Sequence, residues 1–349
     1  MPEWNPADRQ WMSRALTLAA RGLYTTEPNP RVGCVLVKGE QVVGEGWHVQ
    51  AGEGHAEVNA LAQAGEQARG ATAYVTLEPC SHTGKTPPCA DALIAAGVSR
   101  VVAAMQDPNP LVAGNGLQRL RDAGIEVTCG LLEEQARELN PGFIKRMQLG
   151  LPWVRVKLAM SLDGRTAMAS GESKWITGPA ARADVQRLRA RSGAVISGAD
   201  SVLLDDSALT VRASELGLSD EEASAAVQRQ PLRVLIDSLR RVPLEQRFFR
   251  ESGPTLVIST SAEQAAESYQ SIGSELLALP GDDGKVDLPT VLRTLAERGC
   301  NEVLVEAGAA LSGAFWRAGL VDELIVYMAP RLLGSQARPL MQLPFESMS

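Results

Sequence analysis

Four residues in the N-terminal half have the types and spacing of a metal site that activates water. His55 and Glu57 stand two positions apart, and Cys80 and Cys89 follow further along the chain. A zinc ion that activates water needs three protein ligands and one open position. One imidazole and two thiolates, from His55, Cys80 and Cys89, would supply the ligands. Glu57 can face the open position without being a ligand and can carry a proton from the water to a leaving group.

This set matches the signature of zinc deaminases, His-x-Glu followed by Pro-Cys-x-x-Cys, in all respects but one. Eight residues, not two, lie between Cys80 and Cys89. Two simpler interpretations compete. Each cysteine could be a small buried apolar residue, or the three ligands could form a structural zinc site with His82 or His48 as a fourth. The chain has 3 histidines, and one of them falls in His-Ala-Glu ahead of both cysteines, which favours a catalytic site.

Helices and strands must bring these residues together. Asn5-Pro6 is a typical N-cap followed by proline in the first turn, and predicts a helix from there. Residues 32–37 and 42–47 predict two strands of a hairpin around a tight turn. Helices at 55–64 and 91–96 then alternate with strands at 71–77 and 100–105, and a further helix and strand follow through residue 128. This alternation predicts an α/β sandwich, and the match to the zinc-deaminase signature implies that it is cytidine-deaminase-like.

A polar segment with glycine and proline, residues 145–152, predicts a boundary between domains 1–147 and 148–349. A chain of 349 residues is also longer than one hydrophobic core usually supports. Residues 214–230 could be a helical excursion or a mobile loop. In the second half we predict strands at 153–160, 194–197, 232–237, 255–259, 302–305 and 324–329, and helices at 180–191, 288–298 and 311–318.

Composition excludes several functional classes. A net charge of −7 argues against a broad nucleic-acid surface, although small anionic ligands remain possible. Asp8, Arg9 and Arg14 interrupt the stretch where a secretory signal would need its apolar core, and no apolar run reaches membrane-spanning length. The 5 cysteines are too few for a disulfide scaffold and suit a reducing cytosol. We therefore expect a cytoplasmic protein that binds neither nucleic acid nor a membrane.

The second half offers one weak signal for nucleotide binding. Residues 303–308 predict a strand that runs into a glycine turn ahead of a helix. Backbone N–H groups at such a helix start, with Gly308 allowing close approach, could hold a pyrophosphate. The Gly-x-Gly-x-x-Gly fingerprint of Rossmann domains does not occur. From these residues alone, a tight strand-to-helix packing turn is the favoured interpretation.

Two stretches, residues 76–89 (TLEPCSHTGKTPPC) and 28–33 (PNPRVG), closely resemble the bifunctional deaminase–reductases of riboflavin biosynthesis. The long insert between the cysteines is what this family shows, and the resemblance covers essentially the whole chain. It implies that His55, Cys80 and Cys89 bind zinc and that Glu57 carries the proton. It also places Asn29, His82 and Lys85 near the substrate. A turn residue between prolines and a solvated loop charge are the alternatives for Asn29 and Lys85.

Residues 157–167, 171–177, 205–212 and 305–308 look like the reductase domain of the same enzymes. That domain is similar to dihydrofolate reductase, which implies a mostly parallel sheet with NADPH laid across it. Arg189 and Arg212 can each hold a phosphate, and Trp175 offers a flat face to a ring; surface arginines and a core anchor are the alternatives. The implied cofactor contacts are Ala159, Trp175, Ser201, Asp205, Ser238, Gly308, Ala309, Ala310, Leu311, Ser312, Gly313 and Ala314. The implied substrate contacts are Ser173, Arg189, Leu209, Arg212, Glu306 and Lys157.

The resemblance implies two reactions on one phosphorylated pyrimidine. A zinc-dependent hydrolytic deamination of 2,5-diamino-6-ribosylamino-4(3H)-pyrimidinone 5′-phosphate is followed by reduction of its ribosyl group with NADPH, giving 5-amino-6-(ribitylamino)uracil 5′-phosphate. A nucleic-acid or nucleoside deaminase with an unrelated appendage, and a zinc-stabilised module that only senses a nucleotide, are competing hypotheses.

Two further expectations concern assembly and the end of the chain. We expect a homo-oligomer. The family usually continues past Leu332-Leu333-Gly334, whereas this sequence ends at Ser349. We therefore expect the last edge of the reductase sheet to be missing, either because the chain is shortened or because this member lacks it. An exposed edge strand would be prone to mispairing.

Overall fold

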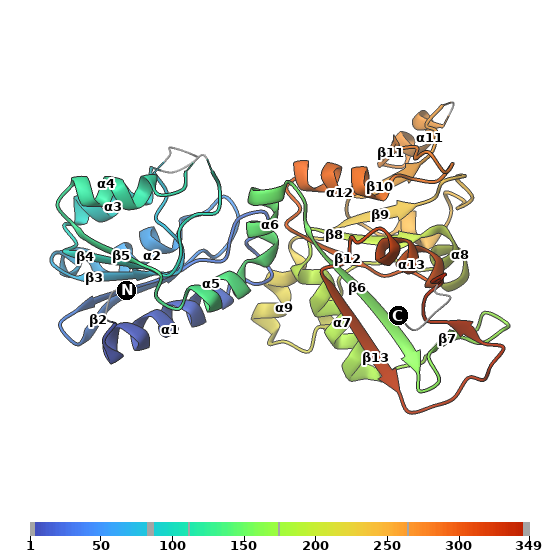
Figure 1. Ribbon diagram of the computed structural model, residues 1–349, viewed down its shortest axis with the longest axis horizontal. Helices are drawn as coiled ribbons and strands as arrows, with labels where there is room; N and C mark the ends of the chain where they lie inside the picture. Colours follow the sequence, from blue (N-terminus) through green and yellow to red (C-terminus); the bar gives the residue numbers. More distant parts are fainter. Residues whose placement is uncertain (1–3, 82–86, 111, 174, 264, 345–349) are drawn as a thin grey trace. The chain divides into compact units, whose positions relative to one another are not determined.

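The computed structural model describes residues 4–81, 87–110, 112–173, 175–263 and 265–344, and it divides into two compact units, Met1–Gly150 and Leu151–Ser349 (Figure 1). Each unit has its own sheet flanked by helices, so the predicted α/β class is confirmed in both halves. Among the described residues, no helix combines the length and the apolar character needed to cross a membrane.

The first helix of the N-terminal unit, α1 (Pro6–Ala20), starts as predicted. Asn5 is its N-cap, and Asn5 and Asp8 form a capping box. The Asp8 carboxylate is buried and also accepts hydrogen bonds from the Tyr74 hydroxyl and the Arg100 guanidinium, both at 2.8 Å. One side chain therefore caps α1 and ties it to the two central strands of the sheet.

The N-terminal sheet has the strand order β2-β1-β3-β4-β5. β1 (Gly33–Lys38) pairs antiparallel with β2 (Gln41–Trp47) and with β3 (Thr72–Val75). β4 (Arg100–Ala103) and β5 (Glu126–Cys129) continue the sheet in parallel. The predicted hairpin and both later strands are confirmed, with ends that differ by a residue or two.

Two glycines of β2 let the helix α2 (Ala56–Ala64) lie directly on the hairpin. A Cβ added at Gly46 would lie 2.4 Å from the carbonyl oxygen of Ala56, and one at Gly44 would lie 2.3 Å from that of Ala60. Real Cβ atoms do not approach so closely, so larger residues would push α2 away. These glycines thereby fix the position of the helix whose first turn carries Glu57.

The remaining helices of this unit pack on the sheet, and the last of them ends next to Gly150, the last residue of the unit. They are η1 (Gly65–Ala68), α3 (Cys89–Ala96), α4 (Asn115–Asp122), α5 (Glu133–Leu139) and α6 (Pro141–Leu149). α6 begins with a proline and buries Ile144. Residues 145–149 of the predicted boundary segment are therefore helical and complete α6.

The C-terminal unit is built on a seven-stranded sheet with the order β11-β10-β9-β8-β12-β6-β13, in which every pair is parallel. This confirms the mostly parallel sheet that the resemblance implies. The strands are β6 (Trp153–Ser161), β8 (Ala194–Gly198), β9 (Leu232–Ile236), β10 (Thr255–Ser259), β11 (Ser274–Ala278), β12 (Glu302–Val305) and β13 (Glu323–Ala329). β7 (Arg165–Ala167) and β14 (Arg338–Pro339) form a separate small pair.

Helices cover both faces of this sheet, and a hydrophobic core lies on each face. Residues 214–230, for which a helix and a mobile loop were both possible, overlap η2 (Ala213–Glu215) and contain α9 (Asp220–Val227). Ser219 and Glu222 form a capping box at the start of α9, so the helical alternative is correct for Asp220–Val227. The other helices are α7 (Pro179–Arg191), α8 (Ala199–Asp205), α10 (Arg247–Arg250), α11 (Ala266–Ser271), α12 (Leu288–Glu297) and α13 (Ala309–Arg317).

A glutamate lies at each end of the inner strand β12. At its start, Glu302 is buried and pairs with Arg155 and, at 3.0 Å, with Arg191. At its end, Glu306 enters the loop that leads to α13. Because all strands are parallel, their carboxyl ends share one edge, which is where open α/β sheets bind their ligands. Glu306 therefore lies at the carboxyl edge of the sheet and Glu302 at the opposite edge.

Candidate active sites

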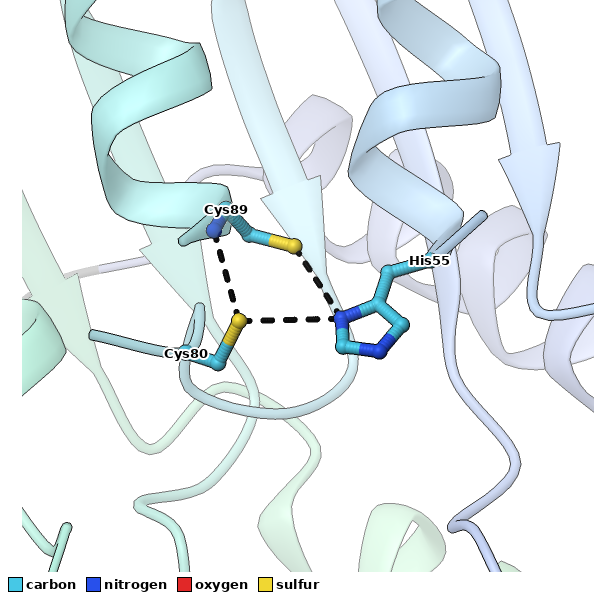
Figure 2. A group of neighbouring side chains, drawn as sticks. All are labelled: His55, Cys80 and Cys89. Atoms are coloured by element: carbon cyan, nitrogen blue, oxygen red, sulfur yellow. Dashed lines mark hydrogen bonds between the residues drawn. The ribbon is translucent and has the colours of Figure 1, made fainter. Parts of the chain in front are cut away.

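The structure brings the three predicted zinc ligands together. His55, Cys80 and Cys89 each offer one ligand atom, and these atoms all lie within 4.8 Å of one another. His55 Nδ1 is 3.3 Å from Cys89 Sγ and 3.6 Å from Cys80 Sγ (Figure 2). The groups thus surround a common point from three sides, as ligands of one ion must.

Each ligand comes from a different element of the N-terminal unit. His55 is the N-cap residue of α2, but its side chain does not cap that helix and is directed at the two sulfur atoms instead. Cys89 is the first residue of α3, and Cys80 lies in the loop after β3. The backbone N–H of Cys89 donates to Cys80 Sγ at 3.3 Å. The fold therefore preforms the cluster.

The two thiols have opposite electrostatic environments. Hydrogen bonds from the Cys89 side chain, the His55 ring and the Cys89 N–H lower the pKa of Cys80 to about 4. The resulting thiolate, together with burial, raises the pKa of Cys89 well above its usual value. A thiolate that forms this readily is suited to a cation, and a soft divalent ion bound there would deprotonate the second thiol.

Glu57 occupies the first turn of α2, beside this cluster. Its side chain is buried, and burial raises its pKa to about 7. The nearby Cys80 thiolate adds to this effect, while the positive charge of His55 opposes it. A carboxyl group poised between its two protonation states near neutral pH can both accept and return a proton.

One nitrogen and two sulfurs form the donor set of a catalytic zinc site that keeps an open position. His48, an alternative fourth ligand, uses both ring nitrogens elsewhere. Its Nδ1 donates to the Gly54 carbonyl at 3.1 Å, and its Nε2 accepts from the Asn29 side-chain amide at 3.0 Å. His82, the other alternative, and Lys85 lie outside the described residues. The donors therefore fit zinc with three protein ligands among the residues that the structure describes.

Asn29 is not only a turn residue, because its side chain is also hydrogen-bonded to His48. Its backbone N–H closes a turn onto Thr26 at 2.7 Å, while its amide side chain meets the buried ring of His48. The ring of His48 in turn stands edge-to-face with that of His55, with centroids 5.4 Å apart. His48 is thus a member of this site that sequence reasoning considered only as a metal ligand.

In the C-terminal unit, the predicted substrate residues Arg189 and Glu306 form a largely buried, bidentate ion pair. The Arg189 guanidinium donates to both carboxylate oxygens of Glu306, at 2.5 and 3.0 Å, and to the carbonyl of Thr210 at 3.0 Å. Lys157 Nζ is 3.7 Å from the same carboxylate. Despite burial, these two cations lower the pKa of Glu306. Glu306 thus holds both basic groups at the carboxyl edge of the sheet.

The other predicted arginine is also paired. Arg212 donates to Glu215 at 2.7 Å, and its backbone N–H donates to Gln186 at 3.0 Å. Leu209, three residues before Arg212, is buried and has a positive φ of 59°. Both arginines assigned to a phosphate therefore already have a carboxylate partner, so a phosphate would have to share or replace it.

Predicted cofactor residues gather at the same edge. Gly308 is the N-cap of α13, and its N–H donates to Ser201 Oγ at 3.0 Å. Ser173 Oγ donates to Asp205 at 2.6 Å. Ala159 lies near the end of β6, and Ser238 is the second residue after β9. Residues Ala309, Ala310, Leu311, Ser312, Gly313 and Ala314 form the first turns of α13.

Two details limit where a cofactor can lie. A Cβ added at Gly313 would be 2.4 Å from the carbonyl oxygen of Gln342, so the C-terminal segment covers that face of α13. Trp175 is 62% exposed, with the Arg182 guanidinium 4.7 Å from the ring centroid. Its exposure excludes the core-anchor alternative. Trp175, Thr177, Tyr327 and Arg331 help to line a cavity of about 470 Å³ beside α7.

Comparisons with known proteins cover both units. Residues 5–105 match the family model described as the cytidine and deoxycytidylate deaminase zinc-binding region, and residues 152–347 match the RibD C-terminal domain. The riboflavin biosynthesis protein RibD of Escherichia coli is 56% identical over 97% of this chain and 91% of its own length. That of Haemophilus influenzae is 53% identical over 99% of this chain and 91% of its own.

Solved structures give the same result. RibD of Acinetobacter baumannii superposes with a TM-score of 0.90 at 52% identity, covering 98% of this chain and 92% of its own. A diaminohydroxyphosphoribosylaminopyrimidine deaminase/5-amino-6-(5-phosphoribosylamino)uracil reductase of Thermotoga maritima has a TM-score of 0.83 at 36% identity, over 96% and 89% of the two chains. The likeness therefore extends through both sites.

Proposed function

Because the chain belongs to the RibD family of bifunctional riboflavin-biosynthesis enzymes, we propose that its two units act in turn on one phosphorylated pyrimidine. The enzyme is a zinc-dependent deaminase and an NADPH-dependent reductase. We assign 2,5-diamino-6-ribosylamino-4(3H)-pyrimidinone 5′-phosphate as the substrate of the first unit. Its deaminated product is the substrate of the second.

His55, Cys80 and Cys89 would hold the zinc ion of the deaminase unit. When bound, zinc supplies the Lewis acidity that makes water nucleophilic near neutral pH. Glu57 accepts a proton as the water oxygen forms a bond to the amine-bearing ring carbon. It then returns that proton to the nitrogen, and the carbon–nitrogen bond breaks to release ammonia. Asn29, whose side-chain amide is held by His48, orients the substrate. The observation that carries this step is the close approach of one nitrogen and two sulfurs beside a buried carboxyl group.

In the reductase unit, the carboxyl edge of the sheet orients the ribosyl group. When bound, NADPH would supply a hydride to the anomeric carbon of that group, and the ring oxygen would take a proton as the sugar opens to a ribityl chain. The N–H groups at the start of α13 would hold the cofactor phosphates. Lys157 and Arg189, held by Glu306, bind the substrate. The protein thus contributes position and charge to the reaction.

Supplying the diaminopyrimidine with and without NADPH tests this order. Ammonia should appear in both cases, whereas NADPH oxidation should begin only after ammonia has been released. NADPH oxidation on the diamino compound without ammonia release would contradict the proposal.

We also propose that the enzyme is a cytoplasmic homo-oligomer. All five cysteines are free thiols, which suits a reducing compartment. β13 ends the strand order of the C-terminal sheet, and Leu324, Val326 and Met328 on it are exposed. An exposed edge strand with apolar side chains favours pairing with a further strand, and we propose that a second copy of this chain supplies that contact.

Light scattering during gel filtration should therefore give a mass of at least two chains for the wild type. The Met328→Lys variant should shift toward the monomer and keep its deaminase activity. A monomeric wild type at tens of micromolar, or a Met328→Lys variant with unchanged mass, would contradict a contact through β13.

A further inference from the structure

Glu78 stands two residues before the ligand Cys80, and its carboxylate is buried under the start of α4. Glu78 is 5% exposed. Its two oxygens together accept four backbone hydrogen bonds, which is close to the full capacity of a carboxylate. The donors are the N–H groups of Asp107 (3.0 Å), Gly114 (2.9 Å), Gly116 (2.8 Å) and Leu117 (3.1 Å).

Gly116 brings the backbone of α4 against the residue between Glu78 and Cys80. A Cβ added at Gly116 would lie 1.9 Å from the carbonyl oxygen of Pro79. This contact is possible only for glycine. The backbone that leads into Cys80 is therefore held both by the Glu78 carboxylate and by direct contact with α4.

Arg119, one turn further along α4, reaches the chain on the other side of Cys80. Its guanidinium donates to the carbonyl of Ser81 at 3.2 Å and to the Asp91 carboxylate at 2.8 Å. Asp91 lies in the first turn of α3, two residues after Cys89. Glu78, Gly116 and Arg119, here called the α4 anchor, thus connect α4 to both cysteine-bearing segments.

The two segments also bond to each other directly. The Ala90 N–H donates to the Cys80 carbonyl at 3.1 Å, and the Cys89 N–H donates to Cys80 Sγ at 3.3 Å. A shift of the Glu78–Cys80 backbone would therefore move Cys80 relative to Cys89. Since zinc–sulfur bonds tolerate little variation in length, such a shift would weaken the site.

We propose that Glu78 is a positioning residue for the zinc site, which it serves by anchoring the Cys80 backbone to α4. The inference rests on the proposed function, in which Cys80 and Cys89 are zinc ligands. Glutamine has the same shape as glutamate, but its NH₂ group would point a donor at backbone donors. Glu78→Gln therefore releases part of the anchor without leaving a cavity.

The test compares Glu78→Gln with the wild type and with Glu134→Gln, a control that alters an exposed carboxylate of the same unit. We expect Glu78→Gln to release zinc to a chromophoric chelator about 10-fold faster, as for other residues that orient ligands. The cobalt(II)-substituted protein should show altered absorption bands. The kcat of deamination should fall with little change in KM, and reduction of the deaminated intermediate should keep its rate. Glu134→Gln should match the wild type.

Zinc release and cobalt spectra identical to the wild type in a folded Glu78→Gln protein would overturn the proposal. If Glu78→Gln does not fold, Arg119→Gln tests the proposal instead. The Arg119 side chain is half exposed, and its removal leaves the buried Glu78 carboxylate in place. Faster zinc release from Arg119→Gln then supports the anchor, and an unchanged rate overturns it. A wild-type protein that binds no zinc would instead contradict the proposed function.

Discussion

Replacing Glu57 with glutamine is expected to abolish ammonia release while leaving reduction of the deaminated intermediate at the wild-type rate. The amide keeps the size of the side chain but cannot accept the proton of the attacking water. General acid–base catalysis contributes about 10²- to 10⁴-fold to a rate, so deamination should fall by at least about 100-fold. Ammonia release and NADPH oxidation, each assayed with its own substrate, give the two readouts.

Glu53→Gln is the matched control for this change. Glu53 is an exposed glutamate in the loop before α2, so its variant should keep both activities. Zinc content should stay at one ion per chain in both variants, because neither residue is a predicted ligand. Loss of both activities in Glu57→Gln, or deamination near the wild-type rate, would count against separate sites with Glu57 as the proton carrier.

Replacing Glu306 with glutamine should have the converse effect, a loss of reductase activity with deamination intact. Glu306 is the shared buried partner of Arg189 and Lys157. Removing one partner of a buried ion pair costs about 3–5 kcal/mol. If the two cations lose their positions to this extent, kcat/KM for the deaminated substrate should fall by at least about 100-fold. NADPH oxidation at limiting substrate measures the change.

Glu302→Gln separates this site effect from a loss of stability. Glu302 is more deeply buried than Glu306, also pairs with two cations, and lies at the other end of the same strand. Both variants should lower the melting temperature, but Glu302→Gln should keep kcat/KM at a temperature where it is folded. Equal losses of kcat/KM in the two variants would show that Glu306 acts through stability alone.

Local features of the fold could be predicted from the sequence because their signals lie within a few residues. The Asn5-Pro6 cap, the hairpin around residues 38–41 and the strand at 255–259 depend on turn chemistry and periodicity, and the structure has them where expected. The ligand cluster was also predictable, because imidazole, carboxylate and two thiols in this order have few other uses.

Contacts between distant segments could not be predicted. Glu306 and Arg189 meet across 117 positions, and no periodicity links them. The sequence therefore predicts a phosphate contact for Arg189 and Arg212 but not the carboxylate that each of them also meets. The hydrogen bonds of Glu78 could not be predicted either. Their backbone donors lie some 30 to 40 positions further along the chain, in a loop and the start of α4 that carry no motif. The bond between Asn29 and His48 likewise has no sequence signal.

X-ray absorption at the zinc edge tests the central claim most directly. The purified wild type should hold one zinc ion per chain, with two sulfur ligands at about 2.3 Å and two nitrogen or oxygen ligands at about 2.0–2.1 Å. One of the two light ligands should be exchangeable solvent, displaced by a competitive inhibitor of deamination. A shell with two imidazoles and two thiolates and no exchangeable ligand would show a closed structural site and would contradict this account.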